Sequence, residues 1–335
     1  MKLTNKNNFH IGIAAWLAMN DYNNGSDTLV TDKPIISATA LLKSTRQSIL
    51  TQRINKSPDI ELTSDVSDFI SSKFGNALHD AIQSTWEGNW QGALESIGVP
   101  KEQILRTIVN PDPATVQPHN IPIYIEKRSF KELDDVIISG KYDMVYGGDL
   151  LDFKSTATYT YVRDTKREDY ILQGSIYRWL NPEIIKSDSI YITFFFTDWQ
   201  KFQAQSTPGY PPAKIVTVPY QLLSLEDTER YIMSRLKEYR DNVSKPEADI
   251  VFCNDKELWL SQTEFRYYSD PMKAKDPNSR CTKRFTSMSE ANTYRLEKGK
   301  GVINTRKGEA KACAYCPAMP ICSQAKSLFP NGLPK

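Results

Sequence analysis

The spacing of apolar residues in the first part of the chain predicts two helices. Over residues 37–54, apolar side chains recur at intervals of three and four among Lys and Arg, which is typical of a basic amphipathic helix with Ser37 as its N-cap. A second helical pattern covers residues 66–82, and Ser64-Asp65 stand before it as a cap. His79 lies on a face of this second helix that differs from its main apolar stripe.

From residue 121 the hydrophobic period changes to two, which predicts strands. We expect an antiparallel meander of short strands at residues 121–127, 134–138, 142–146 and 149–155. The pattern then predicts a helix at 167–180, a buried strand at 189–198, a strand at 214–219 and a long helix at 225–242. This order of elements indicates an α/β or α+β fold with a central mixed sheet flanked by helices.

The residue composition of the chain changes beyond Lys245-Pro246. Here Pro, Asp, Lys and Arg replace the periodic apolar pattern, and all the cysteines lie in this part of the chain. We therefore predict an N-terminal arm with the basic helix at residues 1–60, a core at 61–245 and a C-terminal cysteine-containing lobe at 246–335.

Composition narrows the class of protein. The 335 residues include 42 Lys or Arg and 40 Asp or Glu, and 40% of residues are hydrophobic, which excludes global disorder, collagen-like repetition and a disulfide-dense miniprotein. Because the formal charge is only +2, any nucleic-acid surface must be a local one. The five cysteines, an odd number, and the lack of a long apolar window predict a cytoplasmic protein with reduced thiols and no membrane partner.

Two carboxylates and a lysine form the strongest candidate for chemistry. On the predicted strand 149–155, Asp152 and Lys154 leave the same face, and Asp143 on the neighbouring strand points to the same spot. A triplet of this kind also occurs on exposed strands that merely alternate charges. Two oxygen donors beside a lysine are nevertheless what a Mg²⁺-dependent phosphodiester hydrolase needs.

These residues resemble the PD-(D/E)XK nuclease superfamily, specifically the branch with RecB-type nucleases, the exonucleases of CRISPR adaptation and many phage exonucleases. The branch has a helical His, an upstream acid, an Asp on the first strand, a (D/E)XK strand and a QxxxY motif on the next helix. In this order the matching residues are His79, Glu126, Asp143, Asp152-Phe153-Lys154 and Gln173 with Tyr177. The proline of the family name is replaced by Tyr142.

The resemblance implies a restriction-endonuclease-like core and a role for each matching residue. His79, Asp143, Asp152 and the main-chain carbonyl of Phe153 would hold Mg²⁺ or Mn²⁺. Lys154 would be the catalytic lysine, and Glu126 a further ligand. Gln173 and Tyr177 would support the lysine or contact DNA.

The implied activity is a metal-dependent DNA exonuclease of phage or mobile-element type that acts on linear DNA with free ends, in the host cytoplasm if phage-encoded. Its partners would be DNA and a recombination protein such as a single-strand annealing protein. The alternatives are a noncatalytic DNA-binding subunit of a recombination complex on the same fold and an endonuclease on the same core.

The spacing of the C-terminal cysteines predicts a second metal site. Cys313, Cys316 and Cys322 form a C-x2-C-x5-C run, and either Cys253 or Cys281 is available as the fourth ligand. Tetrathiolate ligation suits both an iron-sulfur cluster and Zn²⁺. Three buried, metal-free cysteines are the plain alternative.

The cysteine run is similar to that of iron-sulfur-containing RecB-family nucleases, in which a distant cysteine completes the set. The segment from Cys253 to Trp259 resembles an element that precedes the run in many phage members. This resemblance favours Cys253 over Cys281, and [4Fe-4S] over Zn²⁺.

Local basic runs and aromatic residues are candidates for DNA contact, although each run is equally well explained as a solvated face. The runs lie at residues 43–53, 127–128, 163–167 and 298–311. The aromatic candidates, for most of which a core role is the simpler interpretation, are Tyr159, Tyr161, Trp179 and Tyr315.

Overall fold

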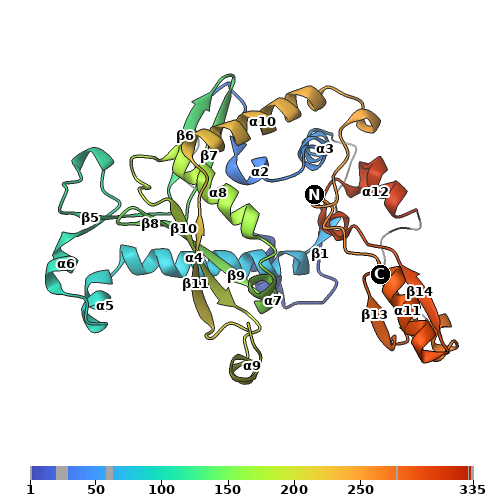
Figure 1. The fold of residues 1–335 in the computed structure, drawn as a ribbon. Coiled ribbons are helices and arrows are strands. Elements are labelled where there is room, and N and C mark those ends of the chain that lie inside the picture. Colours follow the sequence, from blue (N-terminus) through green and yellow to red (C-terminus); the bar gives the residue numbers. More distant parts are fainter. Residues whose placement is uncertain (1, 20–28, 58–62, 277, 331, 333–335) are drawn as a thin grey trace. The chain divides into compact units, whose positions relative to one another are not determined.

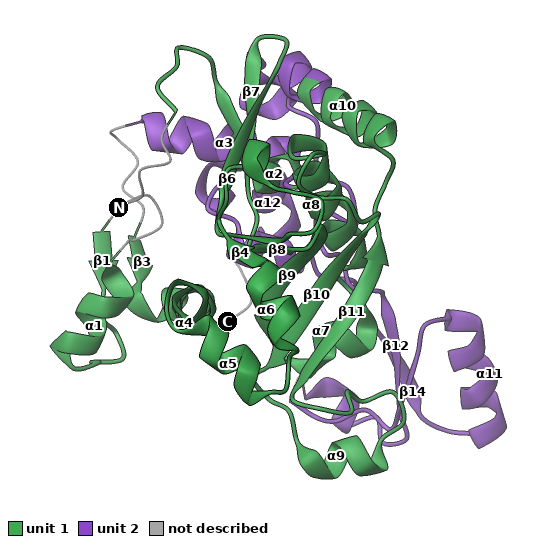
Figure 2. Ribbon diagram, turned by 90° about the vertical axis from the view of Figure 1, so that its left-hand side faces the viewer, with its two compact units in different colours: residues 1–42, 59–236 green, residues 43–58, 237–335 purple. Residues whose placement is uncertain are grey.

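The computed structural model of the chain describes residues 2–19, 29–57, 63–276, 278–330 and 332. The chain forms two compact units, coloured separately in Figure 2: residues 1–42 with 59–236, and residues 43–58 with 237–335. Residues 43–58 thus group with the C-terminal part of the chain, whereas the sequence-based division had placed them in an N-terminal arm.

A six-stranded mixed sheet forms the centre of the first unit (Figure 1). In chain order its strands are β4 (Thr107–Val109), β5 (Ile121–Ile125), β8 (Met144–Tyr146), β9 (Asp149–Thr156), β10 (Ser189–Phe196) and β11 (Ile215–Gln221). Their order across the sheet is β11-β10-β9-β8-β5-β4. The pairs β9–β10 and β4–β5 are parallel, and β10–β11, β5–β8 and β8–β9 are antiparallel. The predicted mixed sheet is confirmed.

The predicted single meander is wrong in its middle part. A hairpin of β6 (Arg128–Leu133) and β7 (Val136–Lys141) leaves the central sheet and pairs with the N-terminal strand β2 (Ile35–Ser37), which runs parallel to β7. Val136, Ile137 and Ile138 are all buried, so β7 needs cover on both faces and a partner on each edge. That second partner comes from about a hundred residues upstream, which local periodicity does not indicate.

Two helices cover opposite faces of the central sheet. Helix α4 (Ile70–Glu87) packs through Ile82 and Trp86 on the face that carries Phe153 of β9. Helix α8 (Arg167–Leu180) packs on the other face, against buried residues such as Leu150 of β9. Because side chains alternate along β9, Asp152 and Lys154 belong to the α8 face.

The N-terminal end of α4 confirms the predicted cap. Asp65 accepts hydrogen bonds from the backbone and hydroxyl of Ser67, and Asp68 accepts one from the backbone of Asp65. This capping box begins a 3-10 turn, η1 (Val66–Phe69), that leads directly into α4.

The predicted basic helix at residues 37–54 is in fact two helices. Ser37 caps α2 (Ala38–Leu41), and Ser44 caps α3 (Thr45–Lys56) by accepting from the backbone of Gln47. Ser44 begins a new helix inside the predicted one, so the helical pattern is interrupted between Leu41 and Thr45. The chain passes from the first compact unit to the second within this interruption.

The remaining elements of the first unit are short, apart from the long helix α10, which runs on into the second unit. They are β1 (Lys2–Thr4), α1 (Ile11–Ala18), β3 (Thr63–Asp65), α5 (Trp90–Ser96), α6 (Lys101–Arg106), η2 (Pro113–Thr115), α7 (Thr158–Arg163), α9 (Lys201–Ser206) and α10 (Leu225–Val243). The strands β1 and β3 form a parallel pair.

The second unit has one small sheet and several short helices. Its C-terminal elements are η3 (Glu247–Asp249), β12 (Glu264–Tyr268), η4 (Lys273–Lys275), β13 (Lys283–Phe285), α11 (Met288–Lys298), β14 (Val302–Arg306), η5 (Lys311–Tyr315), η6 (Met319–Ile321) and α12 (Ser323–Leu328). The sheet order is β13-β12-β14, with both pairs antiparallel. Among the residues that the structure describes, no helix is both long and apolar enough to span a membrane.

Candidate functional site

Two buried carboxylates face each other across the β8–β9 pair. Met144 pairs with Leu151, and the same register places Asp143 opposite Asp152. Asp152 is 1% exposed and Asp143 is 9% exposed. Burial, and then the negative charge of Asp152, raise the pKa of Asp143 to about 7, although Asp143 Oδ2 accepts a 2.7 Å hydrogen bond from the backbone N–H of Phe153.

His79 reaches this pair from α4 and joins two further groups to it. Its Nδ1 atom lies 3.0 Å from Glu126 Oε1 and 3.5 Å from Asp143 Oδ1, and its Nε2 lies 3.1 Å from the main-chain oxygen of Phe153. Burial alone lowers the pKa of His79, but Glu126 and Asp143 outweigh it and raise that pKa above its ordinary value. Among the described residues, His79, Glu126 and Asp143 form the one group of potential ligand atoms that all lie within 4.8 Å of one another.

Glu126 is positioned by an unusual backbone conformation. Its φ of +50° is rare for a residue with a side chain, and its N–H donates a 2.8 Å hydrogen bond to the main-chain oxygen of Asp143. Burial by itself raises the pKa of Glu126, but His79 and the ion pair of 2.8 Å with Lys141 lower it overall. Glu126 is therefore held as a carboxylate beside the imidazole.

Lys154 stands beside Asp152 as the alternation of β9 predicts. Its Nζ lies 2.6 Å from Asp152 Oδ2. Apart from this ion pair, neither buried carboxylate oxygen of Asp152 has a hydrogen-bond partner among the described residues. A buried carboxylate that lacks hydrogen bonds is unfavourable unless a cation compensates for it.

Gln173 and Tyr177 come together on α8, as their spacing of four predicts. Gln173 Nε2 donates a 2.8 Å hydrogen bond to Tyr177 Oη, and Tyr177 is 4% exposed. Gly140 on β7 leaves the room for this ring, because a Cβ there would lie 2.9 Å from Tyr177 Cδ1.

A pocket of about 280 Å³ in the first unit is lined by most of these groups, but Asp152 and Lys154 are not among its lining residues. Its lining includes the predicted His79, Glu126, Asp143, Gln173 and Tyr177, and also Trp16, Thr39, Lys73, Asn76, Ala77, Asp80 and Lys141. Lys141 lies two residues before Asp143, in the gap between the predicted strands at residues 134–138 and 142–146, and was not among the predicted site residues. Trp16 carries no signal of this role in the sequence, because only the tertiary fold brings α1 to the pocket.

Gly75 has no close-packing role, although it lies four residues before His79. A Cβ at Gly75 would meet no atom within 4 Å. No protein contact therefore requires a glycine at this position.

In the second unit, a group of four cysteines lies together: Cys253, Cys313, Cys316 and Cys322, here named the cysteine cluster. Burial raises the pKa of Cys313 to about 11, and the other three thiolates of the cluster add to that rise. Cys281 lies apart in sequence, just before β13, where its charge acts on Arg266.

Polar side chains hold the cysteine cluster from several directions. Arg46 of α3, 1% exposed, donates from Nε to Cys322 Sγ at 3.2 Å, and Ser44 Oγ lies 3.3 Å from Cys253 Sγ. Gln324 accepts from the Cys253 N–H and donates to the Cys253 carbonyl, both at 2.8 Å. Sequence reasoning had not connected Gln324 or Arg46 with the cysteines.

The candidate DNA-contact residues divide between core and surface. Trp179 is 2% exposed and its Nε1 donates to Glu229, while Tyr161 packs on Phe194 and Phe196. Tyr159 and Tyr315 are exposed, at 64% and 77%. In the basic run 43–53, burial excludes Arg46 from any contact with DNA.

No family model and no curated protein matches the chain. Among solved structures, the chain is similar to the crystal structure of SSO0001, with 13% sequence identity and a TM-score of 0.36 over 63% of this chain and 78% of that one. It is also similar to a phage related exonuclease from Haemophilus somnus 129PT, with 19% identity and a TM-score of 0.23. That match covers 34% of this chain and 58% of the exonuclease.

Proposed function

We propose that the chain is a divalent-metal-dependent DNA exonuclease of the PD-(D/E)XK, RecB-like branch. One observation carries the proposal: the two buried carboxylates Asp143 and Asp152 face each other, with His79 and Glu126 beside the first and Lys154 beside the second. A purely structural role explains such a set poorly, because burying like charges together costs free energy.

The donor set fits Mg²⁺ or Mn²⁺. Asp152 offers two buried oxygens, of which Oδ2 is paired with Lys154, and burial together with the charge of Asp152 raises the pKa of Asp143. His79, Asp143, Asp152 and the carbonyl of Phe153 would hold the ion, with Glu126 as a further ligand. When bound, such an ion polarises the phosphate and lowers the pKa of water.

The side chains around this site have distinct tasks in phosphodiester hydrolysis. The Lys154 ammonium lies where it can neutralise charge that develops on the phosphate or orient the attacking water. Lys141 holds Glu126 as a carboxylate, and Glu126 in turn fixes the orientation of the His79 ring. Tyr177 and Gln173 line the same pocket and are placed to support the substrate strand.

The test is the degradation of linear DNA. Purified protein is expected to digest end-labelled linear DNA with Mg²⁺ or Mn²⁺ and to stop with EDTA, and Lys154→Met is expected to lose this activity. Full activity in that variant would contradict the mechanism. Cleavage of closed circular DNA would instead indicate an endonuclease, and binding without cleavage in either metal would indicate a noncatalytic DNA-binding subunit.

We further propose that the cysteine cluster binds [4Fe-4S]. The charges of the other three cysteines of the cluster all act on the Cys313 thiol, so the four lie close together, and tetrathiolate ligation suits both an iron-sulfur cluster and Zn²⁺. The resemblance of the cysteine run to that of iron-sulfur-containing RecB-family nucleases favours the iron-sulfur cluster. A brown protein with broad visible absorption and bound iron supports this proposal, whereas a colourless protein with stoichiometric zinc contradicts it.

We also propose a biological setting for this activity. An exonuclease that leaves single-stranded DNA would supply the substrate of a single-strand annealing protein in phage recombination. Co-purification of such a protein with this chain is the corresponding measurement.

A further inference from the structure

A strongly basic segment lies between Cys253 and the other three residues of the cysteine cluster. Residues 264–311, here named the basic appendage, contain 12 Lys or Arg and 6 Asp or Glu. Because the whole chain has 42 and 40, the remaining residues hold 30 basic and 34 acidic side chains. The net positive charge of the protein is therefore concentrated in the basic appendage.

The basic appendage is a small folded subdomain that leaves the rest of the chain and returns to it at nearly the same place. It consists of the sheet β13-β12-β14 with α11 packed against it, as Tyr294 of α11 contacts Tyr267 of β12 at 5.2 Å between ring centroids. Its two ends meet, because Ser261 N–H donates to the Glu309 carbonyl at 3.1 Å and Leu260 bridges Ala310. Figure 1 shows this part in orange.

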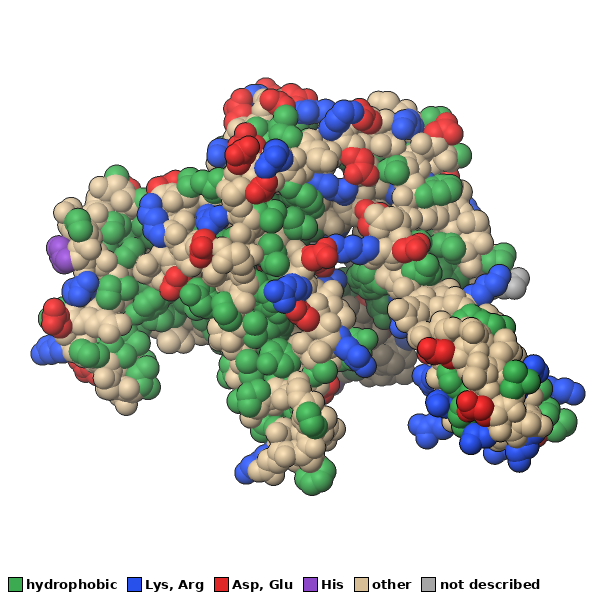
Figure 3. Space-filling model, viewed as in Figure 1, with side chains coloured by type: hydrophobic (Ala, Val, Ile, Leu, Met, Phe, Trp, Pro, Cys, Tyr) green, Lys and Arg blue, Asp and Glu red, His purple; other side chains and the backbone are tan. Residues whose placement is uncertain are grey.

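Nearly all of its positive charge faces solvent. Eleven of the twelve basic residues are exposed, and Arg266 is the exception. Glu264 pairs with Arg266 and Arg284, and Glu309 pairs with Arg306. Figure 3 shows Lys and Arg side chains gathered over α11, β13 and β14, with few acids among them.

The fold brings basic turns from separate parts of the sequence onto one small sheet. Asn304 of β14 donates to the Ala274 carbonyl at 2.6 Å and so holds the turn η4, with Lys273 and Lys275, beside that strand. Tyr267 Oη donates to the Lys300 carbonyl at 3.0 Å, which fixes the turn between α11 and β14. These charges therefore form one positive surface rather than a mobile basic tail.

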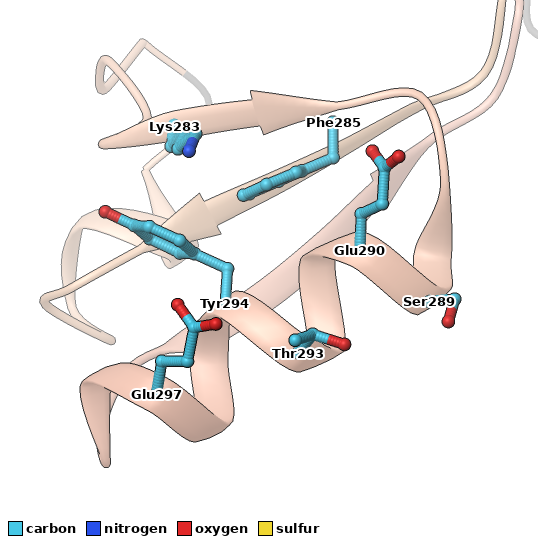
Figure 4. A pocket seen from close by; sticks show the side chains of 7 residues that line it. All are labelled: Lys283, Phe285, Ser289, Glu290, Thr293, Tyr294 and Glu297. Carbon is cyan, nitrogen blue, oxygen red and sulfur yellow. The ribbon is translucent and has the colours of Figure 1, made fainter.

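The groove between β13 and α11 is not itself the anion site. Figure 4 shows Glu290 and Glu297 of α11 along it, with Lys283 beside the rings of Phe285 and Tyr294. Lys283 Nζ lies 4.4 Å from the Tyr294 ring centroid and 5.0 Å from that of Phe285, so cation–π contacts already hold this ammonium. Phosphate contacts are expected at the exposed turns instead.

We propose that the basic appendage binds the phosphate backbone of DNA, without reading its sequence, and so holds the substrate of the nuclease. This inference rests on the proposed function for the identity of the polyanion. A dense array of exposed Lys and Arg gives affinity that falls steeply with salt, because each phosphate contact releases a bound counterion.

The experiment compares two triple charge reversals. The test variant carries Lys273→Glu, Lys300→Glu and Lys307→Glu, and the matched control carries Lys101→Glu, Lys201→Glu and Lys214→Glu, which are exposed positions of the first unit. Binding of fluorescent DNA is measured by anisotropy in metal-free buffer over a range of salt. We expect the affinity of the test variant for DNA to fall about tenfold or more. The magnitude of its slope of log K against log salt should decrease by about 2 to 3, whereas both quantities should change little in the control.

Several outcomes would overturn the inference. They are unchanged affinity and salt slope in the test variant, equal losses in the control, or binding to phosphatidylserine vesicles at a salt concentration that abolishes binding to DNA. Thermal melting of both variants checks that the appendage still folds. Binding is measured without metal, so it does not depend on cleavage. If the test variant loses binding but the wild-type protein never cleaves DNA, only the proposed nuclease activity is rejected. If the test variant binds normally and still cleaves DNA, only this inference is rejected.

Discussion

The His79 Nε2 atom lies 3.1 Å from the main-chain oxygen of Phe153, the residue between Asp152 and Lys154. This contact joins α4, on one face of the sheet, to the backbone of β9, whose Asp152 and Lys154 side chains leave on the other face. The proposed metal ligands thus come from one helix, α4, and from the strands of the sheet and their connections.

Asp152→Asn tests the carboxylate without changing its size. We expect DNA cleavage to fall by about a hundredfold or more, because an amide cannot supply the negative charge that a divalent ion needs. The fold should persist, since the substitution also removes a buried like charge. The matched control is Asp149→Asn, an exposed position on the same strand, which should cleave end-labelled DNA as the wild type does.

The pH dependence of metal binding follows from Asp143, whose pKa in the metal-free protein is about 7. In the unfolded chain an Asp titrates near 4, so the metal-free fold loses stability as pH rises from about 4 to about 7. A divalent ion needs the carboxylate form. Mn²⁺ should therefore raise the melting temperature more at pH 8 than at pH 6, and Asp143→Asn should reduce this difference to the part that comes from His79, whose pKa is also raised. Equal shifts at both pH values would argue against Asp143 as a ligand.

Gly140→Ala and Gly75→Ala should have opposite effects on stability. At Gly140 a Cβ would lie 2.7 Å from Leu180 Cδ1 and 2.9 Å from Tyr177 Cδ1, so we expect a loss of about 1–3 kcal/mol and displacement of Tyr177. At Gly75, within α4, nothing lies within 4 Å, so alanine should gain about 0.5–1 kcal/mol. Urea unfolding measures both. A neutral Gly140→Ala would mean that β7 and α8 can separate easily.

Arg46→Met removes the cation buried beside Cys322. Arg46 also donates to the carbonyls of Glu247 and Ile250, at 3.2 and 2.8 Å, and forms an ion pair with the Glu247 side chain. We expect a loss of about 2–3 kcal/mol, because the two carbonyls would lose their donor and Glu247 would lose its cation but keep its hydrogen bonds from Ser323. The matched control is Arg240→Met, an exposed arginine of α10 in the same unit, which should change the unfolding free energy little.

Two cysteine substitutions separate the alternatives for the fourth ligand. Cys253→Ser is expected to abolish the bound iron and its visible absorption, because Cys253 lies with the other three thiols of the cluster. Cys281→Ser should leave both unchanged, since Cys281 lies beside Arg266 in the basic appendage. The opposite pattern in iron content would exclude Cys253.

The elements whose signals are local could be predicted from the amino-acid sequence alone. Helix α8 begins and ends at the predicted residues, and the alternation along β9 places Asp152 and Lys154 on one face, because side-chain direction in a strand depends only on position. The cap at Asp65 was likewise readable, since a capping box needs only neighbouring residues.

The tertiary fold set everything that depends on contacts between distant segments. It moved β6 and β7 into a sheet with β2, brought Trp16 and Lys141 to the pocket, and set Asp143 opposite Asp152 so that burial and repulsion raise the pKa of Asp143. It also placed Cys253, and not Cys281, beside the C-terminal cysteines. Periodicity records which face of an element is buried, but the partner that buries it is chosen by packing across the whole chain.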